Sequence, residues 1–352
     1  MRRLRYDSLQ HPDSMISTPN RRVAYWLLAC ALLVFAMIVL GGVTRLTRSG
    51  LSIVEWRPVS GILPPLSHEA WVAEFDKYKQ TPEYRHVNRD MGLTGFQAIF
   101  WVEYSHRLLG RAIGVVFLLP LIYFAIRRRI DAALARRLGA IFLLGGAQGA
   151  LGWYMVKSGL VNDPHVSPYR LTAHLGFAVF IYALLIASIV RVWGSRRTRM
   201  HAGTVRAAWL IVALVFVMIL SGGFVAGTKA GFVFNTFPLM AGRFVPEGVL
   251  ALQPWWRNLF ENVATVQFDH RLIAYCLCIA IPAYWLYARA RVSGGARLAL
   301  HALPIALALQ VVLGIATLLH VVPIPLAAAH QAGAVVVFTA ALALALLLKT
   351  RP

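Results

Sequence analysis

Runs of apolar residues long enough to cross a lipid bilayer recur along the whole chain. A helix needs about 20 mostly apolar residues to cross roughly 30 Å of hydrocarbon. Eight stretches meet this requirement and are predicted to be transmembrane helices: 23–44, 97–126, 138–157, 169–193, 207–228, 263–289, 298–319 and 324–348. The pattern therefore predicts an all-α membrane protein with eight membrane-spanning helices.

Composition supports this interpretation and excludes several others. Of the 352 residues, 59% are hydrophobic and only 14% are charged, with a mean hydropathy of +0.63. Such a composition excludes a soluble globular protein and a disordered one. The three cysteines, Cys30, Cys276 and Cys278, all lie in apolar runs, so a disulfide scaffold is also excluded.

The net charge of +21 would suggest nucleic acid in a soluble protein, but here it indicates orientation. Twenty of the 35 lysines and arginines lie in the N-terminal arm, three of the connections and the C-terminal tail, with only three aspartates among them. If eight helices alternate in direction, all these segments lie on one side of the membrane. Because cationic connections stay in the cytoplasm, both termini are predicted to be cytoplasmic and nucleic acid is not expected as a partner.

The chain also repeats itself, in two halves of four helices each. The matched segments are Leu40-Gly41-Gly42 with Ser221-Gly222-Gly223, Arg48-Ser49-Gly50-Leu51 with Lys229-Ala230-Gly231-Phe232, the runs 102–108 and 266–272, Gln148 and Gly152 with Gln310 and Gly314, and 171–174 with 327–330. Each half contains an even number of helices, so both halves run in the same direction. The sequence thus predicts two parallel-repeat four-helix bundles related by an axis along the membrane normal.

The repeat and the charge pattern together divide the chain into five parts. They are a cytoplasmic N-terminal arm (1–22), an N-terminal four-helix half (23–193), a cytoplasmic linker (194–206), a C-terminal four-helix half (207–348) and a cytoplasmic tail (349–352). Two long connections, about 45–96 and 229–262, are predicted to lie on the outer side.

Four of the eleven histidines occupy repeat-equivalent positions. His106, His174, His270 and His330 each lie about 8–14 Å inside the outer start of a predicted helix, so they share one layer. A single membrane histidine is commonly an interhelical hydrogen-bond partner. Four at matched depth favour metal ligands, because neutral imidazoles on facing helices can hold a haem iron from both sides. The remaining histidines have no matched partner and are expected to be solvated or interfacial: His11, His68, His86, His165, His201, His301 and His320.

The two halves differ beside the histidines. Glu103 precedes His106 by three residues, on the same helical face, whereas the equivalent residue of the second half is Gln267. A carboxylate can accept a proton or stabilise a cation, and an amide can do neither, so the first half is the better candidate for a reacting site. The alternative is that Glu103 only pairs with Arg107 and holds the helix end; spacing alone does not separate the two.

Several long motifs, in order, resemble those of the haem A synthase (CtaA) family. They are Gly41-Gly42-Val43-Thr44-Arg45-Leu46-Thr47-Arg48-Ser49-Gly50-Leu51-Ser52, Pro64-Pro65, Thr81-Pro82-Glu83-Tyr84, the run from Phe100 to Arg111 that contains Glu103 and His106, and Phe268-Asp269-His270-Arg271. The resemblance covers essentially the whole chain. Some bacterial members carry a cysteine pair in the outer connections; this chain lacks it there and resembles the branch shared by proteobacteria and mitochondria.

This resemblance implies an oxidoreductase that converts the C8 methyl group of haem O to a formyl group, with water as the oxygen source. It implies that His270 and His330 ligate a resident haem b, and that His106 and His174 bracket the substrate haem. Glu103 would assist catalysis. Arg107 and Arg271, which match in the repeat, are candidates for binding haem propionates, with anchoring of the helix ends as the alternative.

The resemblance also implies partners and a location. Haem O is the expected substrate, with haem O synthase and an electron acceptor not identified by the sequence as functional partners; membrane lipid surrounds the protein, and a homo-oligomer is left open. Thirty arginines against five lysines fit a GC-rich bacterial genome, so the bacterial inner membrane is favoured over the mitochondrial one. Two other classes stay open: a bis-histidine b-type cytochrome that oxidises or reduces quinol, and a haem carrier or assembly protein without chemistry.

Overall fold

The computed structural model describes residues 20–56, 61–160 and 164–351. The predicted N-terminal arm, 1–22, therefore lies almost wholly outside the described residues. Eight of the described helices are long and apolar enough to span a membrane: α1 (Arg21–Leu46), α4 (Leu93–Ile126), α5 (Ala132–Lys157), α6 (Pro168–Val192), α7 (Ala202–Gly227), α9 (Val263–Ala288), α10 (Gly294–Leu319) and α11 (Ile324–Leu347). The prediction of an all-α membrane protein with eight spans is confirmed.

Some helices begin earlier than their apolar runs predicted. α5 begins at Ala132 rather than at 138, and α7 begins at Ala202 rather than at 207. The additional turns contain arginines, which an apolar scan omits although they fit a helix end at the membrane surface. Asp131 caps α5 by accepting from the Leu134 N–H, and His201 caps α7 by accepting from the Gly203 N–H.

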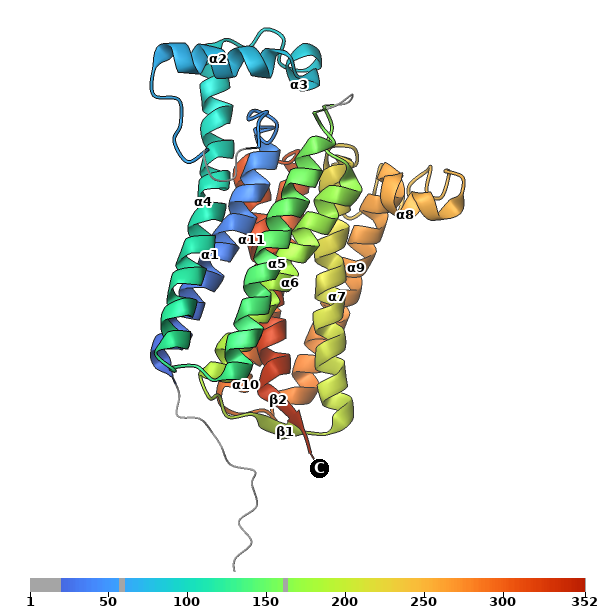
Figure 1. Ribbon diagram of the computed structural model, residues 1–352. Coiled ribbons are helices and arrows are strands. Elements are labelled where there is room, and N and C mark those ends of the chain that lie inside the picture. The colour runs from blue at the N-terminus through green and yellow to red at the C-terminus, as the bar shows by residue number, and fades with distance from the viewer. Residues whose placement is uncertain (1–19, 57–60, 161–163, 352) are drawn as a thin grey trace, which may run out of the picture.

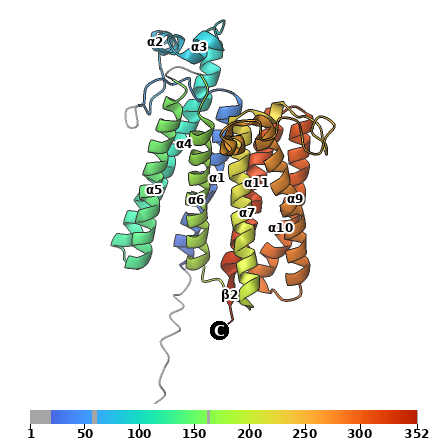
Figure 2. The same ribbon diagram turned by 90° about the vertical axis from the view of Figure 1, so that its right-hand side faces the viewer.

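The eight helices form two adjacent groups, which Figure 1 and Figure 2 show from two sides. In the first group α1 packs on α4, α4 on α5, α5 on α6 and α6 on α1. In the second group α7, α9, α10 and α11 pack in the same cyclic order. The two groups meet where α6 contacts α7 and α11, and where α11 contacts α1. One apolar core runs through both groups.

Close backbone approach joins the groups at the outer end. A Cβ atom at Gly227, the last residue of α7, would lie 2.7 Å from the Cα atom of Pro168 at the start of α6. Polar side chains also cross the boundary: Arg45 donates to the carbonyl of Ala226, and Gln331 Nε2 donates to the Ile38 carbonyl at 2.6 Å. The accepting carbonyls lie near a helix end or close to a glycine, where a side chain from another helix can reach them.

The end of the bundle opposite the C-terminus carries the two long connections, predicted to be outer, which fold into short elements (Figure 1). The first contains α2 (His68–Lys79) and α3 (Pro82–His86), and the second contains η1 (Ala230–Phe232), η2 (Trp255–Arg257) and α8 (Asn258–Glu261). α4 has 34 residues, about 51 Å at the usual rise per residue, and is longer than a bilayer core requires. Its outer end supports α2 and α3 (Figure 1) through a second aromatic cluster centred on Tyr78, Phe96 and Phe100.

A small sheet closes the opposite end. β1 (Thr198–Met200) pairs in parallel with β2 (Leu348–Thr350), with Thr198 opposite Leu348. The sequence predicted irregular linker and tail segments there, so this sheet was missed. Three-residue strands carry too short an alternation to be recognised, and their pairing joins segments that lie about 150 residues apart in the chain.

The contact between Gly227 and α6 generates a stability prediction. Gly227→Ala would push a methyl group into the backbone of Pro168, so the free energy of unfolding should fall by about 1–3 kcal/mol. The measurement is thermal unfolding of the detergent-solubilised protein, followed by circular dichroism. The matched control is Gly114→Ala, where a Cβ atom meets nothing within 4 Å and stability should be unchanged or slightly higher. Equal melting temperatures for both variants would contradict the proposed close contact.

Candidate functional site

The four repeat-matched histidines lie on alternate helices of the two groups. His106 is on α4, His174 on α6, His270 on α9 and His330 on α11. Since α4 and α6 each pack on α1 and α5, they occupy opposite corners of the first group, as α9 and α11 do in the second. His106 interacts electrostatically with His174, and His270 with His330. The structure thus brings the histidines together as one pair in each half.

His106 and His270 each face a glycine of the first helix of their half. A Cβ atom at Gly41 would lie 3.3 Å from Nε2 of His106, and a Cβ atom at Gly222 would lie 3.4 Å from Cε1 of His270. Gly41 and Gly222 are the residues that the internal repeat matches. At both positions the absence of a side chain leaves room for an imidazole against the neighbouring helix.

His174 and His330 have the same relation to the third helix of their half. A Cβ atom at Gly152 would lie 2.9 Å from Cε1 of His174, and a Cβ atom at Gly314 would lie 2.7 Å from Cε1 of His330. Both distances are too short for a real Cβ contact. These two positions therefore require glycine as long as the imidazoles keep their orientation.

Matched glutamines hold the backbone beside these two histidines. Gln148 Nε2 donates to the carbonyl of His174 at 3.0 Å, and Gln310 Nε2 donates to the carbonyl of His330 at 2.9 Å. A carbonyl within a helix that accepts an additional bond fixes that turn against the neighbouring helix. The sequence singled out these glutamines only as repeat matches; their function as supports of the histidine turns appears with the structure.

Two imidazole nitrogens of the layer have no hydrogen-bond partner among the residues that the structure describes. Nδ1 of His174 and Nδ1 of His330 are buried without a hydrogen bond, whereas Nδ1 of His270 lies 2.9 Å from the Ser221 hydroxyl. Among the described residues, no three or more of His, Cys, Asp and Glu gather as a metal cluster. Facing pairs of imidazoles with unsatisfied nitrogens fit a metal that takes two axial ligands, as a haem iron does.

Glu103 is buried at the boundary between α4 and the first outer connection, with 3% of its surface exposed. One carboxylate oxygen accepts from the Ser52 hydroxyl at 2.7 Å and from the Ile53 N–H at 2.8 Å. The other accepts from Nε and from the terminal nitrogen of Arg107, at 3.0 and 2.6 Å. These four bonds fix the position of both carboxylate oxygens against the connection and Arg107.

At the equivalent position in the second half, the hydrogen bonds to the connection run in the opposite direction. Gln267 is equally buried, and its Nε2 donates to the carbonyls of Ala230 and Phe234, at 3.0 and 3.4 Å. Its Oε1 and the Nε of Arg271 are buried and have no hydrogen-bond partner in the described part of the chain. Glu103 thus accepts hydrogen bonds from the first long connection, whereas Gln267 donates hydrogen bonds to the second long connection and carries no charge.

The two matched arginines hold these same connections. Arg107 donates to the carbonyls of Ile53 and Glu55, at 2.8 and 3.0 Å. Arg271 donates to the carbonyl of Phe234 at 3.0 Å and, at 3.4–3.5 Å, to those of Pro238 and Leu239. Ile53 and Phe234 are equivalent in the repeat. The anchoring alternative considered for these arginines is therefore observed, and contact with haem propionates stays a prediction.

A second buried carboxylate lies in the outer connection above Glu103. Glu83, in α3, is 4% exposed and accepts from the Tyr78 hydroxyl at 3.2 Å, while Asn88 donates to that hydroxyl at 2.7 Å. Burial raises the pKa of Glu83 to about 7; the hydrogen bond from Tyr78 opposes this rise, the charge of Glu103 adds to it, and Arg48 opposes it. The motif Thr81-Pro82-Glu83-Tyr84 marked this segment in the sequence, but nothing in it indicated burial.

Of the other six described histidines, which were expected to be solvated or interfacial, five are exposed and His301, in α10, is half-buried. His301 accepts from the indole N–H of Trp285 at 3.0 Å, and His320 Nδ1 lies 2.9 Å from the carbonyl of Ala316. His11 lies outside the described residues. The three cysteines are free; Cys30 is buried, whereas Cys276 and Cys278 are exposed on the surface of the helix bundle.

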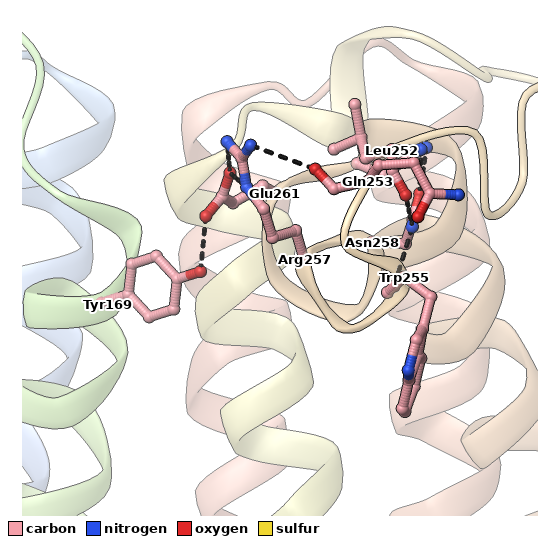
Figure 3. A network of polar contacts seen from close by, with 8 residues as sticks. Tyr169, Leu252, Gln253, Trp255, Arg257, Asn258 and Glu261 are labelled. Atoms are coloured by element: carbon pink, nitrogen blue, oxygen red, sulfur yellow. Dashed lines mark hydrogen bonds and ion pairs between the residues drawn. The ribbon is translucent and has the colours of Figure 1, made fainter.

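A polar network links the two halves on the outer side (Figure 3). Tyr169, at the start of α6, donates to Glu261 at 2.8 Å, and Glu261 also accepts from Nε of Arg257 at 2.9 Å. The hydrogen bonds from Arg257 and Tyr169 lower the pKa of Glu261. Asn258 is fully buried and ties the turn before α8 by donating to the carbonyls of Leu252 and Trp255, each at 2.8 Å.

Eight helices that can span a membrane, with one pair of half-buried histidines in each group of four, define a multi-pass membrane protein. A family model described as cytochrome oxidase assembly protein (COX15-CtaA) matches residues 24–342. The chain belongs to this family.

Several relatives with high sequence identity to this chain are named haem A synthase. The chain is 56% identical over 328 residues to the haem A synthase of Nitrosospira multiformis, and the match covers 92% of each chain. It is 52% identical to the haem A synthase of Nitrosomonas eutropha and 49% identical to that of Parvibaculum lavamentivorans, with 91% of this chain and 92% of each relative covered. The family resemblance identified from the sequence motifs is confirmed.

The bonds of Arg271 generate a prediction about the second outer connection. Arg271→Ala would remove the donors to the carbonyls of Phe234, Pro238 and Leu239. The free energy needed to open this connection should fall by about 1.5–3 kcal/mol, so cleavage of segment 233–257 should become about tenfold faster or more. The measurement is limited proteolysis of the solubilised protein. Arg243→Ala is the control, because that exposed arginine pairs only with exposed Glu247. Equal cleavage rates in the two variants would refute the anchoring function of Arg271.

Proposed function

We propose that this protein oxidises the C8 methyl group of haem O to a formyl group, with water as the oxygen source, and so makes haem A. The observation that carries the proposal is the difference between the halves beside their histidine pairs: a buried carboxyl side chain, Glu103, in the first and a buried amide, Gln267, in the second. The names of relatives that match over about 92% of the chain support the same activity. Two equivalent electron-transfer sites would not need this difference.

The second half is proposed to hold the resident cofactor, haem b, between His270 and His330. Bound there, the haem would supply one-electron redox chemistry. His270 would be oriented by its contact with the Ser221 hydroxyl, and His330 by the bond from Gln310 to its backbone. The Ser221 contact engages Nδ1 of His270 and leaves its Nε2 available to the haem iron, whereas the Gln310 bond positions only the helical turn that carries His330. The absence of a charged group at Gln267 suits a site that carries electrons without proton chemistry.

The first half is proposed to bind haem O between His106 and His174. Glu103 lies three residues before His106, on the same face of α4, so its carboxylate is directed toward the same side of the bundle as the imidazole. Arg107, Ser52 and the Ile53 N–H fix that carboxylate in position. There it can take up a proton from the reacting methyl or water, or stabilise an electron-poor methyl carbon.

The proposed orientation places both histidine pairs in the outer leaflet. The cationic connections, the small sheet and the chain's C-terminus lie at one end of the helices, and α2, α3 and α8 lie at the other (Figure 1). The positive-inside rule assigns the first end to the cytoplasm. The five-part division of the chain, the parallel repeat, and cytoplasmic placement of both termini belong to this proposal. The matched glycine and glutamine contacts of the two halves support the repeat.

The proposed setting is the bacterial inner membrane, with haem O as the substrate. Haem O synthase is proposed as the supplier of that substrate, and an electron acceptor outside this chain must take the electrons. Haem O carries a long isoprenoid tail, which a site between membrane helices can keep in lipid. The structure contains a single chain, and a homo-oligomer is compatible with the proposal.

The proposal is tested by expressing the chain together with haem O synthase and analysing the extracted haems. The wild-type protein should yield haem A. Glu103→Gln should retain bound haem and lower the yield of haem A by about 100-fold or more, because an amide cannot accept a proton. The control for folding is the spectrum of the resident haem. This spectrum should be unchanged in Glu103→Gln, because the second half already has a glutamine, Gln267, at the equivalent position.

Two outcomes would contradict this assignment. A folded, haem-bearing wild-type protein that yields only haem O would make it a haem carrier or a b-type cytochrome. An unaltered haem A yield in Glu103→Gln would reduce Glu103 to the partner of Arg107.

The assignment of the resident haem to the second half and of the substrate to the first is tested by the absorption spectrum of the resident haem. Replacing His270 or His330 by alanine should abolish the resident b-type spectrum, whereas replacing His106 or His174 should leave it and abolish haem A formation. His301→Ala is the control, since His301 contacts Trp285 away from the layer. If only the His106 and His174 variants lost the resident spectrum, the functions of the two halves would be exchanged.

A further inference from the structure

The two halves differ in the residue of their first helix that precedes the glycine beside a histidine. In the second half this residue is Ser221 of α7, whose hydroxyl lies 2.9 Å from Nδ1 of His270. The equivalent residue of the first half is Leu40 of α1, and its hydrocarbon side chain can neither donate nor accept a hydrogen bond. The repeat thus gives His270 a polar neighbour that its counterpart, His106, lacks at this position.

The rings of these two histidines also turn different edges toward the first helix of their half. A Cβ atom at Gly222 would lie 3.4 Å from Cε1 and 4.0 Å from Nδ1 of His270, so this ring presents its Nδ1–Cε1 edge to α7. A Cβ atom at Gly41 would lie 3.3 Å from Nε2 and 3.7 Å from Cδ2 of His106, so this ring presents its other edge to α1. Nε2 therefore lies on the side of the ring away from the first helix in the second half, and against that helix in the first half.

A hydrogen bond at Nδ1 selects one of these two ring orientations, which a half-turn about the Cβ–Cγ bond exchanges. In His270 the half-turn would replace Nδ1 by Cδ2, a carbon that cannot bond to the Ser221 hydroxyl. When Nδ1 donates its proton to that hydroxyl, Nε2 is unprotonated and has the lone pair that a metal requires. Leu40 cannot select an orientation of the His106 ring in this way. His270 is therefore set to bind iron, and His106 is not.

The second histidine of each pair shows a related difference. The amide nitrogen of Gln148 lies 3.4 Å from Nε2 of His174, and because an amide NH2 group can only donate, this long contact engages the lone pair of the ring nitrogen. Its counterpart Gln310 donates to the backbone carbonyl of His330, which leaves the ring of that histidine unengaged by the amide. A haem that binds in the first half must displace a contact between side chains, which a haem in the second half need not do.

We propose that Ser221 is the positioning residue that makes the second half retain its haem, and that Leu40 at the equivalent position leaves the first half able to exchange its haem. This inference rests on the proposed function, in which the second half keeps haem b while the first half takes up haem O and releases haem A. A resident cofactor needs a ligand that stays in place through many reaction cycles, and a substrate needs one that releases it. Ser221 acts through His270 and does not touch the haem.

The same hydrogen bond affects the redox properties of the site. An imidazole whose Nδ1–H donates to an oxygen is a more basic ligand through Nε2. A more basic ligand stabilises ferric iron more than ferrous iron, because the ferric ion carries one more positive charge. Ser221 therefore favours both slow release of haem b and a lower reduction potential.

The first test is the transfer of haem b to excess apomyoglobin from full-length protein that was expressed without haem O synthase and purified. Ser221→Ala should lose its b-type spectrum about 10–100-fold faster than the wild type, because it lacks the group that orients an iron-binding histidine. Ser221→Thr keeps a hydroxyl and should release haem b at about the wild-type rate. Ser188→Ala is the matched control, since this buried helical serine donates to the carbonyl of Leu184 and should release haem b as the wild type does.

A second readout distinguishes the hydrogen bond from simple packing. In Ser221→Ala the ferric–ferrous equilibrium of haem b should shift toward the ferrous form by about threefold to tenfold, which is roughly 30–60 mV for a one-electron couple. A serine that only filled space would leave the midpoint potential unchanged when replaced by alanine. Redox titration of the purified protein, with Ser188→Ala as the control, measures this shift.

The reverse substitution tests the first half. Leu40→Ser, in protein loaded with purified haem O and given no electron acceptor, should transfer haem O to apomyoglobin about tenfold more slowly or less. The control is Leu40→Ala, which shortens the side chain without adding a hydroxyl and should not slow the transfer. The resident b-type spectrum reports correct folding in both variants.

The outcomes separate this inference from the proposed function. Unchanged release of haem b and an unchanged potential in Ser221→Ala would overturn the inference, whether or not the wild type makes haem A. If Ser221→Ala does not fold, equal release of haem O from Leu40→Ser and Leu40→Ala would overturn it. A wild type that retains haem b but makes no haem A when coexpressed with haem O synthase would overturn the proposed function instead.

Discussion

Polar side chains inside a bilayer must find their partners in the protein, because hydrocarbon offers no hydrogen bonds. The histidine layer follows from this constraint. Each imidazole lies against a glycine, such as Gly41 or Gly314, that lets the next helix approach closely. The turns of His174 and His330 are held by glutamines that bond to the backbone and not to Nδ1 of either ring. Among the described residues, nothing bonds to these two nitrogens, so the scaffold holds the imidazoles in place without engaging Nδ1.

The same framework also explains how two similar halves can differ in chemistry. Arg107 and Arg271 make equivalent bonds to Ile53 and Phe234, so the scaffold at the outer helix ends is shared. What changes is the residue one turn before each arginine, an acid in one half and an amide in the other. Changing one oxygen to nitrogen at this position reverses the hydrogen bonds to the outer connection while retaining its attachment. Function can thus diverge with little cost to the fold.

Much of this could be predicted from the sequence, because apolar length fixes the spans and the repeat fixes which histidines correspond. Glu103, Gln267 and the four histidines were found by alignment of the chain with itself. Glu83 and Tyr78 were not, since their burial depends on how α2 and α3 fold onto α4, and short polar helices outside the membrane carry little periodic signal. The anchoring bonds of Arg271 end on backbone carbonyls, which no side-chain pattern records.

The pairing of β1 with β2 has a consequence for biosynthesis. Thr198–Met200 leaves the ribosome long before its partner, which is almost the last segment to be made. The strand that follows the first half must therefore wait, unpaired, until translation of the whole second half is complete. Its backbone bonds form only when synthesis ends, so this small sheet joins the two bundles at the end that carries the C-terminus as the final step of assembly.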